Sequence, residues 1–520
     1  MDLPDAPSSM RHQHLVNSNE PPNAVEESFF QDAALTTGAR LTQLDQEIRA
    51  LQAERAQLQV QQRQNHSVLS PLRRLPPEVL AEIFSWTLPP TEKLNGNVSD
   101  MKTSPWVLTQ VSSRWRDISV STSSLWCNIS VAYGGESGEM LLNPRLEMIR
   151  TQVERSGARN LMIQFHASES HDSAVQVNLF QFLSSHSTRW EQLSIQIAAA
   201  LVPHLVLLRG RLPVLQGIWT QWDTEDSEIG IDSIDCFEIA PSLLEMGISI
   251  ESRYIPFVFP TCQLTAYRVG CPWDMHHRIL KTAPNIVEAH IMIDADEDPW
   301  AEPSGEFIDM LHLRRLYVSD PEVFDYIRAP ALAEVAMYIE RDSSSESEYL
   351  DTFLARSSCA PRLLCLRGSP DPSITAAILN KHPSITSFAL VHDPRLDSDE
   401  DEEDEPDDPM GRHCHLFTVG NGFGTAVAPH LSEISFGSQH ASMHIDYSLF
   451  LKMLESRDRA ADCALRTAAL LTEFGPLPDP LTLARMDALR KDGLKFMFES
   501  GSEAAHTLEC WTYAYPFETL

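Results

Sequence analysis

The sequence has no long apolar run and no paired cysteine motif. Its most apolar stretch, residues 197–208, is interrupted by Pro203 and His204 and is too short to cross a bilayer. The first residues lack the basic-then-apolar order of a secretion signal. The nine cysteines include no Cys-x-x-Cys, so we expect reduced thiols. These absences favour a soluble protein of the cytoplasm, the nucleus or both.

Positive charge is also scarce. The chain has 40 Lys and Arg against 73 Asp and Glu, which gives a formal net charge of −33. A nucleic-acid backbone or an anionic lipid surface would repel such a chain, because binding to either depends on positive charge. We therefore expect no nucleic-acid partner and no membrane partner.

Catalytic motifs are missing as well. The sequence contains no Gly-x-Ser-x-Gly, no Walker loop and no His-Glu-x-x-His. His413-Cys414-His415 offers metal-type ligands, but zinc needs four converging donors, so a chance cluster is the better interpretation. The glycines at 420, 422 and 424 lack the spacing of a phosphate-binding loop. We predict a non-catalytic protein without a metal or another cofactor.

The chain begins with two segments of different character. Residues 1–40 are rich in polar residues and show little apolar periodicity, which predicts a disordered tail. In residues 41–66, Leu44, Leu51 and Leu58 recur every seven positions, and Leu41 and Ile48 fill the alternate positions. This pattern predicts a coiled-coil-like helix of roughly three heptads. A dimeric coiled coil and a lone helix folded back on the next segment remain equal alternatives.

Residues 70–130 carry the strongest pattern in the chain. Pro76 and Pro77 suit a helix start, because proline's missing N–H costs nothing in the first turn. Apolar residues follow with helical spacing until a second pair of prolines ends the helix. After a polar loop, Ser104 and Pro105 predict the N-cap and first turn of a second helix. A Ser-rich stretch then leads to Trp126 and an alternating apolar run.

This ordered pattern resembles an F-box of the type common in fungal proteins. The matching residues are Leu75-Pro76-Pro77-Glu78-Val79-Leu80, Ile83-Phe84, Val107-Leu108, Val111-Ser112, Arg114-Trp115-Arg116-Asp117-Ile118 and Leu125-Trp126. Ser112 stands where the family often has a cysteine. A plain three-helix element packed inside a larger domain would explain the apolar stripes but not the whole order.

The resemblance implies an F-box-like domain at residues 70–130 that docks on a Skp-type adaptor and, through it, on the cullin of an SCF ubiquitin ligase. The residues that it assigns to adaptor binding are Leu75, Pro76, Val79, Leu80, Ile83, Phe84, Val107, Leu108, Val111, Trp115, Leu125 and Trp126.

A second pattern recurs through residues 131–460. Units of the form Pro-x-Leu-x-x-apolar-x-apolar begin at prolines 213, 241, 284, 330, 361, 383 and 429, and three related units lack this proline spacing. The proline predicts a turn, and the alternation after it predicts a short strand. The expected strands begin near residues 190, 215, 243, 264, 286, 313, 332, 363, 385 and 431. Helical pieces are expected between them at 279–282, 324–327, 349–356 and 374–381.

The spacing of these units resembles that of divergent leucine-rich repeats. The resemblance implies an α/β fold in which an irregular solenoid, a horseshoe, follows the F-box. A set of unrelated strands with turn prolines by chance is the alternative. An acidic insertion at 394–412, with ten acidic residues between Asp397 and Asp408, predicts a solvated disordered loop. Residues 461–520 are placed to cap the array.

The alternate positions of the strands should point away from the core and form the face that binds a target protein. The candidate residues are Glu288, His290, Arg315, Tyr317, Glu334, Tyr338 and Arg367. The sequence therefore predicts a substrate receptor that presents an unknown target protein to the ligase. A leucine-rich-repeat scaffold without a ligase is the alternative.

Overall fold

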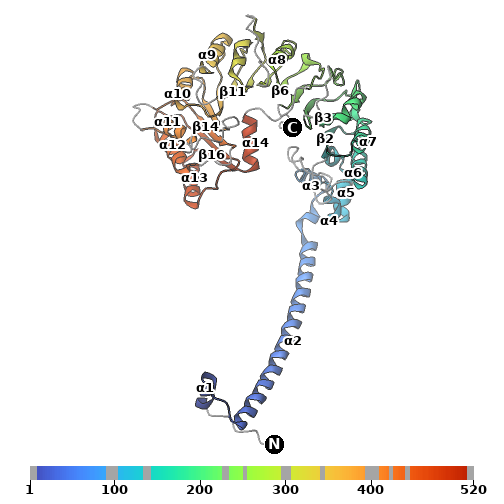
Figure 1. The fold of residues 1–520 in the computed structure, drawn as a ribbon, viewed down its shortest axis with the longest axis vertical. Coiled ribbons are helices and arrows are strands. Elements are labelled where there is room, and N and C mark those ends of the chain that lie inside the picture. Colours follow the sequence, from blue (N-terminus) through green and yellow to red (C-terminus); the bar gives the residue numbers. More distant parts are fainter. Residues whose placement is uncertain are drawn as a thin grey trace. The chain divides into compact units, whose positions relative to one another are not determined.

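The computed structural model describes residues 9–88, 104–132, 142–224, 233–249, 255–293, 306–339, 346–392, 409–420, 426–439 and 445–511. The chain divides into two compact units, Met1–Ile83 and Phe84–Leu520. The first unit is helical, and the second is built on a parallel β-sheet (Figure 1). The protein is thus a mixed α/β chain with a long N-terminal helix and a sheet of 14 strands.

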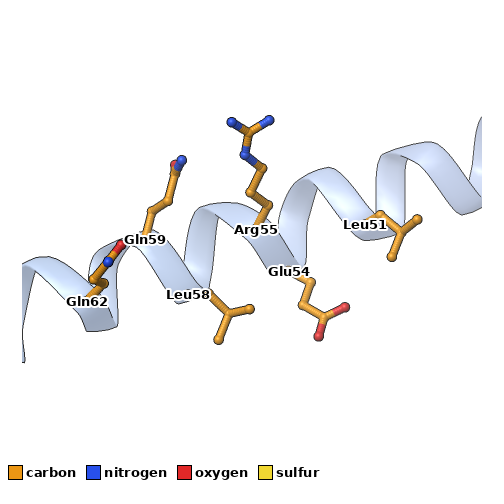
Figure 2. A pocket seen from close by; sticks show the side chains of 6 residues that line it. All are labelled: Leu51, Glu54, Arg55, Leu58, Gln59 and Gln62. Carbon is orange, nitrogen blue, oxygen red and sulfur yellow. The ribbon is translucent and has the colours of Figure 1, made fainter.

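The main element of the first unit is helix α2 (Ala24–Leu69), which contains the whole predicted coiled-coil segment. Ala, Leu, Gln, Glu and Arg dominate its second half, and these residues have high helix propensity. The side chains of residues 41–66 are all exposed. One side of α2 is slightly hollowed between Leu51 and Gln62 (Figure 2).

The predicted disordered tail is wrong where the structure describes it. Helix α1 (Ser9–Asn17) precedes α2, and α2 begins at Ala24 rather than near Leu41. Asn23 and Glu26 form a reciprocal cap at this start: Asn23 Oδ1 accepts from the Glu26 amide at 2.9 Å, and Glu26 Oε2 accepts from the Asn23 amide at 2.9 Å. The cap supplies hydrogen bonds that composition alone does not reveal.

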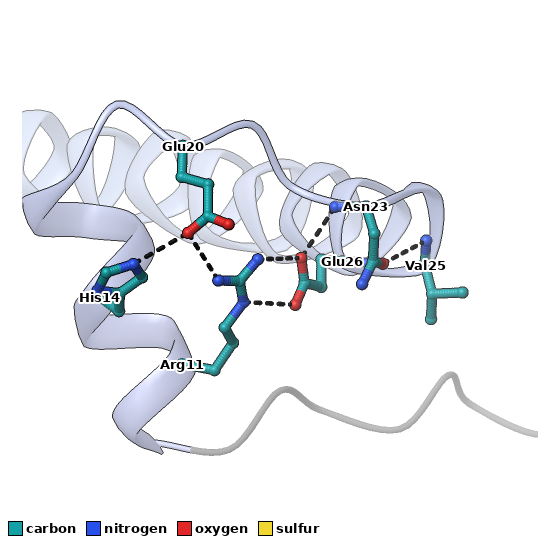
Figure 3. Close-up of polar contacts among 6 residues, drawn as sticks. All are labelled: Arg11, His14, Glu20, Asn23, Val25 and Glu26. Atoms are coloured by element: carbon teal, nitrogen blue, oxygen red, sulfur yellow. Dashed lines mark hydrogen bonds and ion pairs between the residues drawn. The ribbon is translucent and has the colours of Figure 1, made fainter.

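A polar cluster joins α1 to the start of α2 (Figure 3). Arg11 Nη1 lies 2.9 Å from Glu20 Oε2, and Arg11 Nε lies 3.0 Å from Glu26 Oε1. His14 Nε2 also lies 2.9 Å from Glu20 Oε2. The ring of His12 packs edge-on against Phe30 at 5.2 Å. The two helices therefore meet over the first two turns of α2.

The second unit is organised by its sheet, in which all 14 strands run parallel. Their order across the sheet is their order in the sequence, apart from β8 (Ile308–Asp309) and β10 (Ile327–Arg328), which pair separately. The strands are β1 (Asn128–Ala132), β2 (Leu161–His166), β3 (Trp190–Ile197), β4 (Gly217–Trp222), β5 (Glu245–Ile248), β6 (Ala266–Cys271), β7 (Glu288–Ile293), β9 (Arg315–Val318), β11 (Glu334–Ile339), β12 (Leu363–Gly368), β13 (Ser387–His392), β14 (Glu433–Ser438), β15 (Thr467–Thr472) and β16 (Lys495–Ser500). A strand lies at each of the ten predicted positions.

A proline turn delivers several of these strands. The amide of Leu243 donates to Ala240 O at 3.1 Å, and the same bond spans Ala329 to Leu332 and Ala428 to Leu431. In each case the proline follows the accepting residue, which is its preferred place in a type I or type II turn. The leucine that closes the turn is buried. The recurring Pro-x-Leu pattern thus fixes where each of these strands enters the core.

Helices and 3-10 turns form the connections between strands, as parallel pairing requires. They include α6 (Leu142–Arg155), α7 (Ser173–Ser184), η5 (Ala199–Leu208), α8 (Trp273–Leu280), η8 (Pro321–Tyr326), α9 (Glu346–Ser357), α10 (Pro372–Lys381), α11 (Pro409–Phe417), α12 (Tyr447–Arg459) and α13 (Pro480–Asp492). The four predicted helical pieces are present as α8, η8, α9 and α10, but each begins earlier than expected. For η8 and α10, an Asp N-cap followed by proline sets the start.

The main core lies between the sheet and these connections, and a smaller apolar cluster lies on the opposite face. Helix α14 (Ser502–Trp511) belongs to the smaller cluster through Ala504 and Leu508 (Figure 1). Gly437 makes room for it, because a Cβ at this position would lie 2.0 Å from Leu508 Cδ2. The C-terminal helix therefore covers a sheet face rather than continuing the row of connections.

Two predicted boundaries need correction. Residues 461–500 do not form a separate cap, because they contribute β15, α13 and β16 to the same sheet layer. The last described residues, Cys510 and Trp511, belong to α14. The acidic insertion ends at Pro409, where α11 begins, and residues 394–408 lie outside the described residues.

Candidate functional site

The predicted adaptor-binding segment begins with helix α3 (Pro77–Ser85), whose first residue is the expected proline. Upstream, Pro71–Arg74 form the short helix η1. On α3, Leu80 and Phe84 are buried, Ile83 is half-buried, and Val79 is 43% exposed. Leu75 is half-buried and Pro76 is exposed just before the helix. The helix thus has one packed side and one apolar residue in solvent.

The second predicted helix is broken in two. Helix α4 (Leu108–Val111) ends at Ser112, and helix α5 (Ser113–Ser121) begins there. Ser112 Oγ accepts from the Trp115 amide at 3.2 Å and so caps α5. Ser104 does not cap the helix as predicted, because α4 begins four residues later and the Ser104 hydroxyl lies 2.7 Å from Thr87 Oγ1 instead. The residue that departs from the family pattern therefore has a structural role.

Tryptophans build the interior of this segment. The rings of Trp106 and Trp126 pack edge-on at 5.0 Å, and the guanidinium of Arg155, from α6, lies 4.5 Å from the Trp126 ring. Trp126 Nε1 donates to Ser119 O at 2.8 Å, which satisfies the indole inside the core. Trp115 packs against Phe84 at 4.7 Å. Burial lowers the pKa of the Arg155 guanidinium.

The twelve predicted adaptor-binding residues separate by burial. The buried ones are Leu80, Phe84, Leu108, Leu125 and Trp126. These five side chains pack against their own chain, and their part in adaptor binding stays a prediction. Leu75, Ile83, Val107 and Trp115 are half-buried, and Pro76, Val79 and Val111 are exposed. Trp86, which the sequence pattern did not assign to binding, is 75% exposed.

The seven predicted target-binding residues fall into three rows across neighbouring strands. Strand register aligns Glu288 with Arg315 and Arg315 with Glu334 in the first row. It aligns His290 with Tyr317 in the second row and Tyr338 with Arg367 in the third. Their neighbours in sequence, such as Ile291 and Val335, belong to the main core. The predicted common face is therefore formed.

Ion pairs connect the residues of the first row to one another and to neighbouring strands. Glu288 forms ion pairs with Arg268 and, at 3.1 Å, with Arg315. Glu334 pairs at 2.7 Å with Arg362. On the adjacent strand β5, burial raises the pKa of the Glu245 carboxyl, Arg268 opposes the rise and Glu288 adds to it. The row works as an internal electrostatic network.

The predicted exposure of this face is wrong for four of the seven residues. Glu288, His290, Tyr317 and Arg367 are all more than nine-tenths buried. Small side chains on the neighbouring strands let Tyr317 pack into the second apolar cluster, and its ring meets His290 at 4.2 Å. Arg367 Nη2 donates to Gln439 Oε1 at 2.9 Å. Arg315, Glu334 and Tyr338 are half-buried.

Sequence reasoning also missed residues on this face. Trp219 lies across β5, where a Cβ on Gly247 would come within 2.0 Å of its ring, so only glycine fits there. Arg268 and Gln439 hold predicted site residues in place. The strand register could have predicted a place for Arg268 on this face, because Arg268 aligns with His290 in the second row. Gln439 follows β14 and has no such signal.

A hollow lies at the edge where β6, β7, β9 and β11 begin. It is lined by Gln263, Thr265, Asn285, Val287, Leu311, His312, Arg314 and Ala331. Gln263 Nε2 donates to Leu243 O at 2.8 Å, and Asn285 Nδ2 donates to Cys262 O at 2.7 Å, so both amides tie successive turns together. Leu311 and His312 are exposed. This edge offers a mixed apolar and polar surface.

The described residues contain no group of three or more His, Cys, Asp or Glu side chains placed to hold a metal ion. His413 and Cys414 are instead buried on α11, and His413 Nε2 lies 3.1 Å from Thr375 Oγ1. In the part of the chain that the structure describes, no helix has the length and apolarity needed to span a membrane. No protein-family model and no curated protein matches this sequence.

Proposed function

We propose that this protein is an F-box substrate receptor that binds a Skp-type adaptor and presents a target protein to a cullin–RING ubiquitin ligase. The observation that carries the proposal is a segment with its own tryptophan core that leaves Trp86 and Val111 exposed. Exposed valine and tryptophan side chains on a rigid support suit a protein interface, in which aromatic anchors contribute much of the affinity. We place the activity in the cytoplasm, the nucleus or both.

We further propose that the second unit is an irregular leucine-rich-repeat solenoid. Its support is the sequential order of the 14 parallel strands and the recurring proline turn before them. In such an array each unit buries its apolar side chains against its neighbours, so the surface residues can vary without loss of the core. That division suits a receptor for protein targets.

The target surface is proposed at the strand edge rather than at the centre of the polar face. Burial of Tyr317 and Arg367 leaves these residues little area to give to a partner. Leu311 and His312 at the edge hollow are exposed, and connecting segments often carry binding residues on a rigid frame. A photo-crosslinking side chain at position 312 should capture the target, and one at position 367 should not.

The adaptor interface is tested by Trp86→Glu combined with Val111→Glu. Each change places a charge where an apolar contact is proposed, so adaptor affinity should fall at least about a hundredfold. Surface plasmon resonance with a purified Skp-type adaptor measures the loss. Val206→Glu is the matched control, because Val206 is 60% exposed on η5, outside the F-box segment.

Unchanged adaptor affinity in the double variant would place the contact elsewhere. Absence of any adaptor binding by the parent protein would instead favour an interaction scaffold without a ligase. Far-ultraviolet circular dichroism of the variants separates lost binding from lost folding.

A further inference from the structure

Helix α2 carries an exposed apolar stripe from Leu41 to Leu58. Leu41, Leu44, Ile48, Leu51 and Leu58 are between 36% and 64% exposed. Helix α1 contacts the start of α2 through Glu26 and Phe30. A long helix that leaves a regular leucine stripe in water lacks the packing that normally stabilises it.

We propose that residues 41–62 form a parallel, in-register coiled coil with a second copy of this chain. The proposal rests on α2 alone and is independent of adaptor binding. If Leu41 takes heptad position a, then Ile48, Arg55 and Gln62 also occupy a, and Leu44, Leu51 and Leu58 occupy d. Isoleucine at a with leucine at d favours two parallel strands.

The hollow on α2 fits this partner (Figure 2). Its lining consists of Leu51, Glu54, Arg55, Leu58, Gln59 and Gln62. In heptad letters these residues are d, g, a, d, e and a. In a parallel coiled coil, each side chain at position a or d fits into a hole formed by four residues of the partner helix. Leu51, Glu54, Arg55 and Leu58 would form the hole for the partner's residue 55. Arg55, Leu58, Gln59 and Gln62 would form the hole for the partner's residue 58. The residues around the hollow are thus the ones that a parallel partner would contact.

Charge favours the same register. Arg55 at position a would lie beside the partner's Glu54 at position g, and the pair would repeat by symmetry. Arg40 at g would face the partner's Asp45 at e, five residues further along. An antiparallel pair that matches Leu44 with Arg55 would instead bring Glu47 against the partner's Glu54, so like charges would meet twice. The acidic and basic residues therefore select one orientation.

The test is the mass of the full-length chain in solution. Sedimentation at micromolar concentration should give twice the 58.4 kDa of one chain. Leu51→Asp with Leu58→Asp should weaken dimerisation at least about a hundredfold and give the monomer mass, because two apolar layers would become charged. Val60→Asp is the matched control: Val60 is 45% exposed on α2 but lies at heptad position f, away from the stripe.

Charge exchange tests the register. Arg55→Glu should weaken the dimer about tenfold, because it places a second carboxylate beside the partner's Glu54. Adding Glu54→Arg should restore the affinity, because each ion pair is then reversed. Leu44→Cys should give a disulfide-linked dimer under mild oxidation that the parent chain does not give, because equal positions at d meet only in the parallel register.

A monomeric parent chain would overturn the proposal. A dimer that survives Leu51→Asp with Leu58→Asp would do the same, because its interface would then lie elsewhere. Failure of Leu44→Cys to cross-link in an intact dimer would overturn the parallel orientation. Circular dichroism of each variant verifies that the sheet unit remains folded.

Discussion

Helix α2 and the parallel sheet use apolar residues in opposite ways. The sheet buries its alternate residues in one large core and packs part of its other face beneath α14. Helix α2 leaves its leucines at the surface. Because burial of apolar area supplies most of the folding free energy, the sheet unit has its stabilising contacts within one chain. The apolar stripe of α2 stays exposed to solvent in the described residues.

The largest difference should appear when one apolar side chain is truncated in each region. Phe388 is fully buried in β13 and packs against Phe417 at 5.5 Å. Phe388→Ala should lower the free energy of unfolding of the sheet unit by about 3 to 5 kcal/mol, through lost burial and the cavity that remains. Leu51→Ala should change that same transition by less than about 0.5 kcal/mol. Urea denaturation followed by near-ultraviolet circular dichroism measures both.

Equal effects of the two substitutions would contradict the comparison, because α2 would then share the cooperative unit of the sheet.

Removal of a buried ion pair should lower the free energy of unfolding less than truncation of Phe388 does. Glu288→Gln removes the carboxylate that pairs with Arg268 inside the polar face. The buried guanidinium loses its counter-charge, so the free energy of unfolding should fall by about 3 kcal/mol. Asp309→Asn is the control, because the Asp309–Arg328 pair has the same chemistry but both side chains are nearly half exposed. Asp309→Asn should lower the free energy of unfolding by less than about 1 kcal/mol, because exposed ion pairs contribute little to stability.

Chemical denaturation of both variants at neutral pH provides the measurement. A loss for Asp309→Asn as large as that for Glu288→Gln would show that burial does not set the strength of these pairs.

The smallest effect should come from pH. His276 on α8 is fully buried, with Nδ1 2.7 Å from the Tyr267 hydroxyl and Nε2 3.0 Å from Met292 O. Burial lowers the pKa of His276 to about 4, against an ordinary value of 6.5. Between these values the unfolded chain binds more protons than the folded chain, so this residue makes stability fall as pH drops from 6.5 to 4.

The slope from one such group is at most about 1.4 kcal/mol per pH unit. Urea midpoints between pH 7 and pH 4.5 should therefore fall less steeply for His276→Gln than for the parent chain. His277→Gln, one residue further along α8, should keep the parent slope. An unchanged slope for His276→Gln would mean that other groups produce the acid sensitivity.

Comparison of sequence with structure shows why the strands could be predicted and the exposure of their polar face could not. A strand entry depends on a few adjacent residues, such as Pro241 and Leu243, whose turn chemistry is local. Burial of Arg367 depends on Gln439, 72 residues away. No periodic pattern within a strand records such a distant partner.

Residues 70–130 show the same division on a smaller scale. Pro77 predicted the start of α3 correctly because a helix start depends on one turn of chain. The break at Ser112 was missed because serine suits either a helix interior or a cap, and its hydrogen bond to the Trp115 amide decides between them. The tryptophans were visible in the sequence, but their edge-on packing was not.

The sequence by itself determined the helix over residues 41–66, its heptad stripe and the positions of ten strands, because periodicity and turn residues act over a few neighbours. The tertiary structure alone decided that α14 covers one sheet face and that the predicted target-binding row is an internal ion-pair network. Burial is a property of the whole fold. It depends on which distant segments come to lie on a given surface, and local sequence does not specify them.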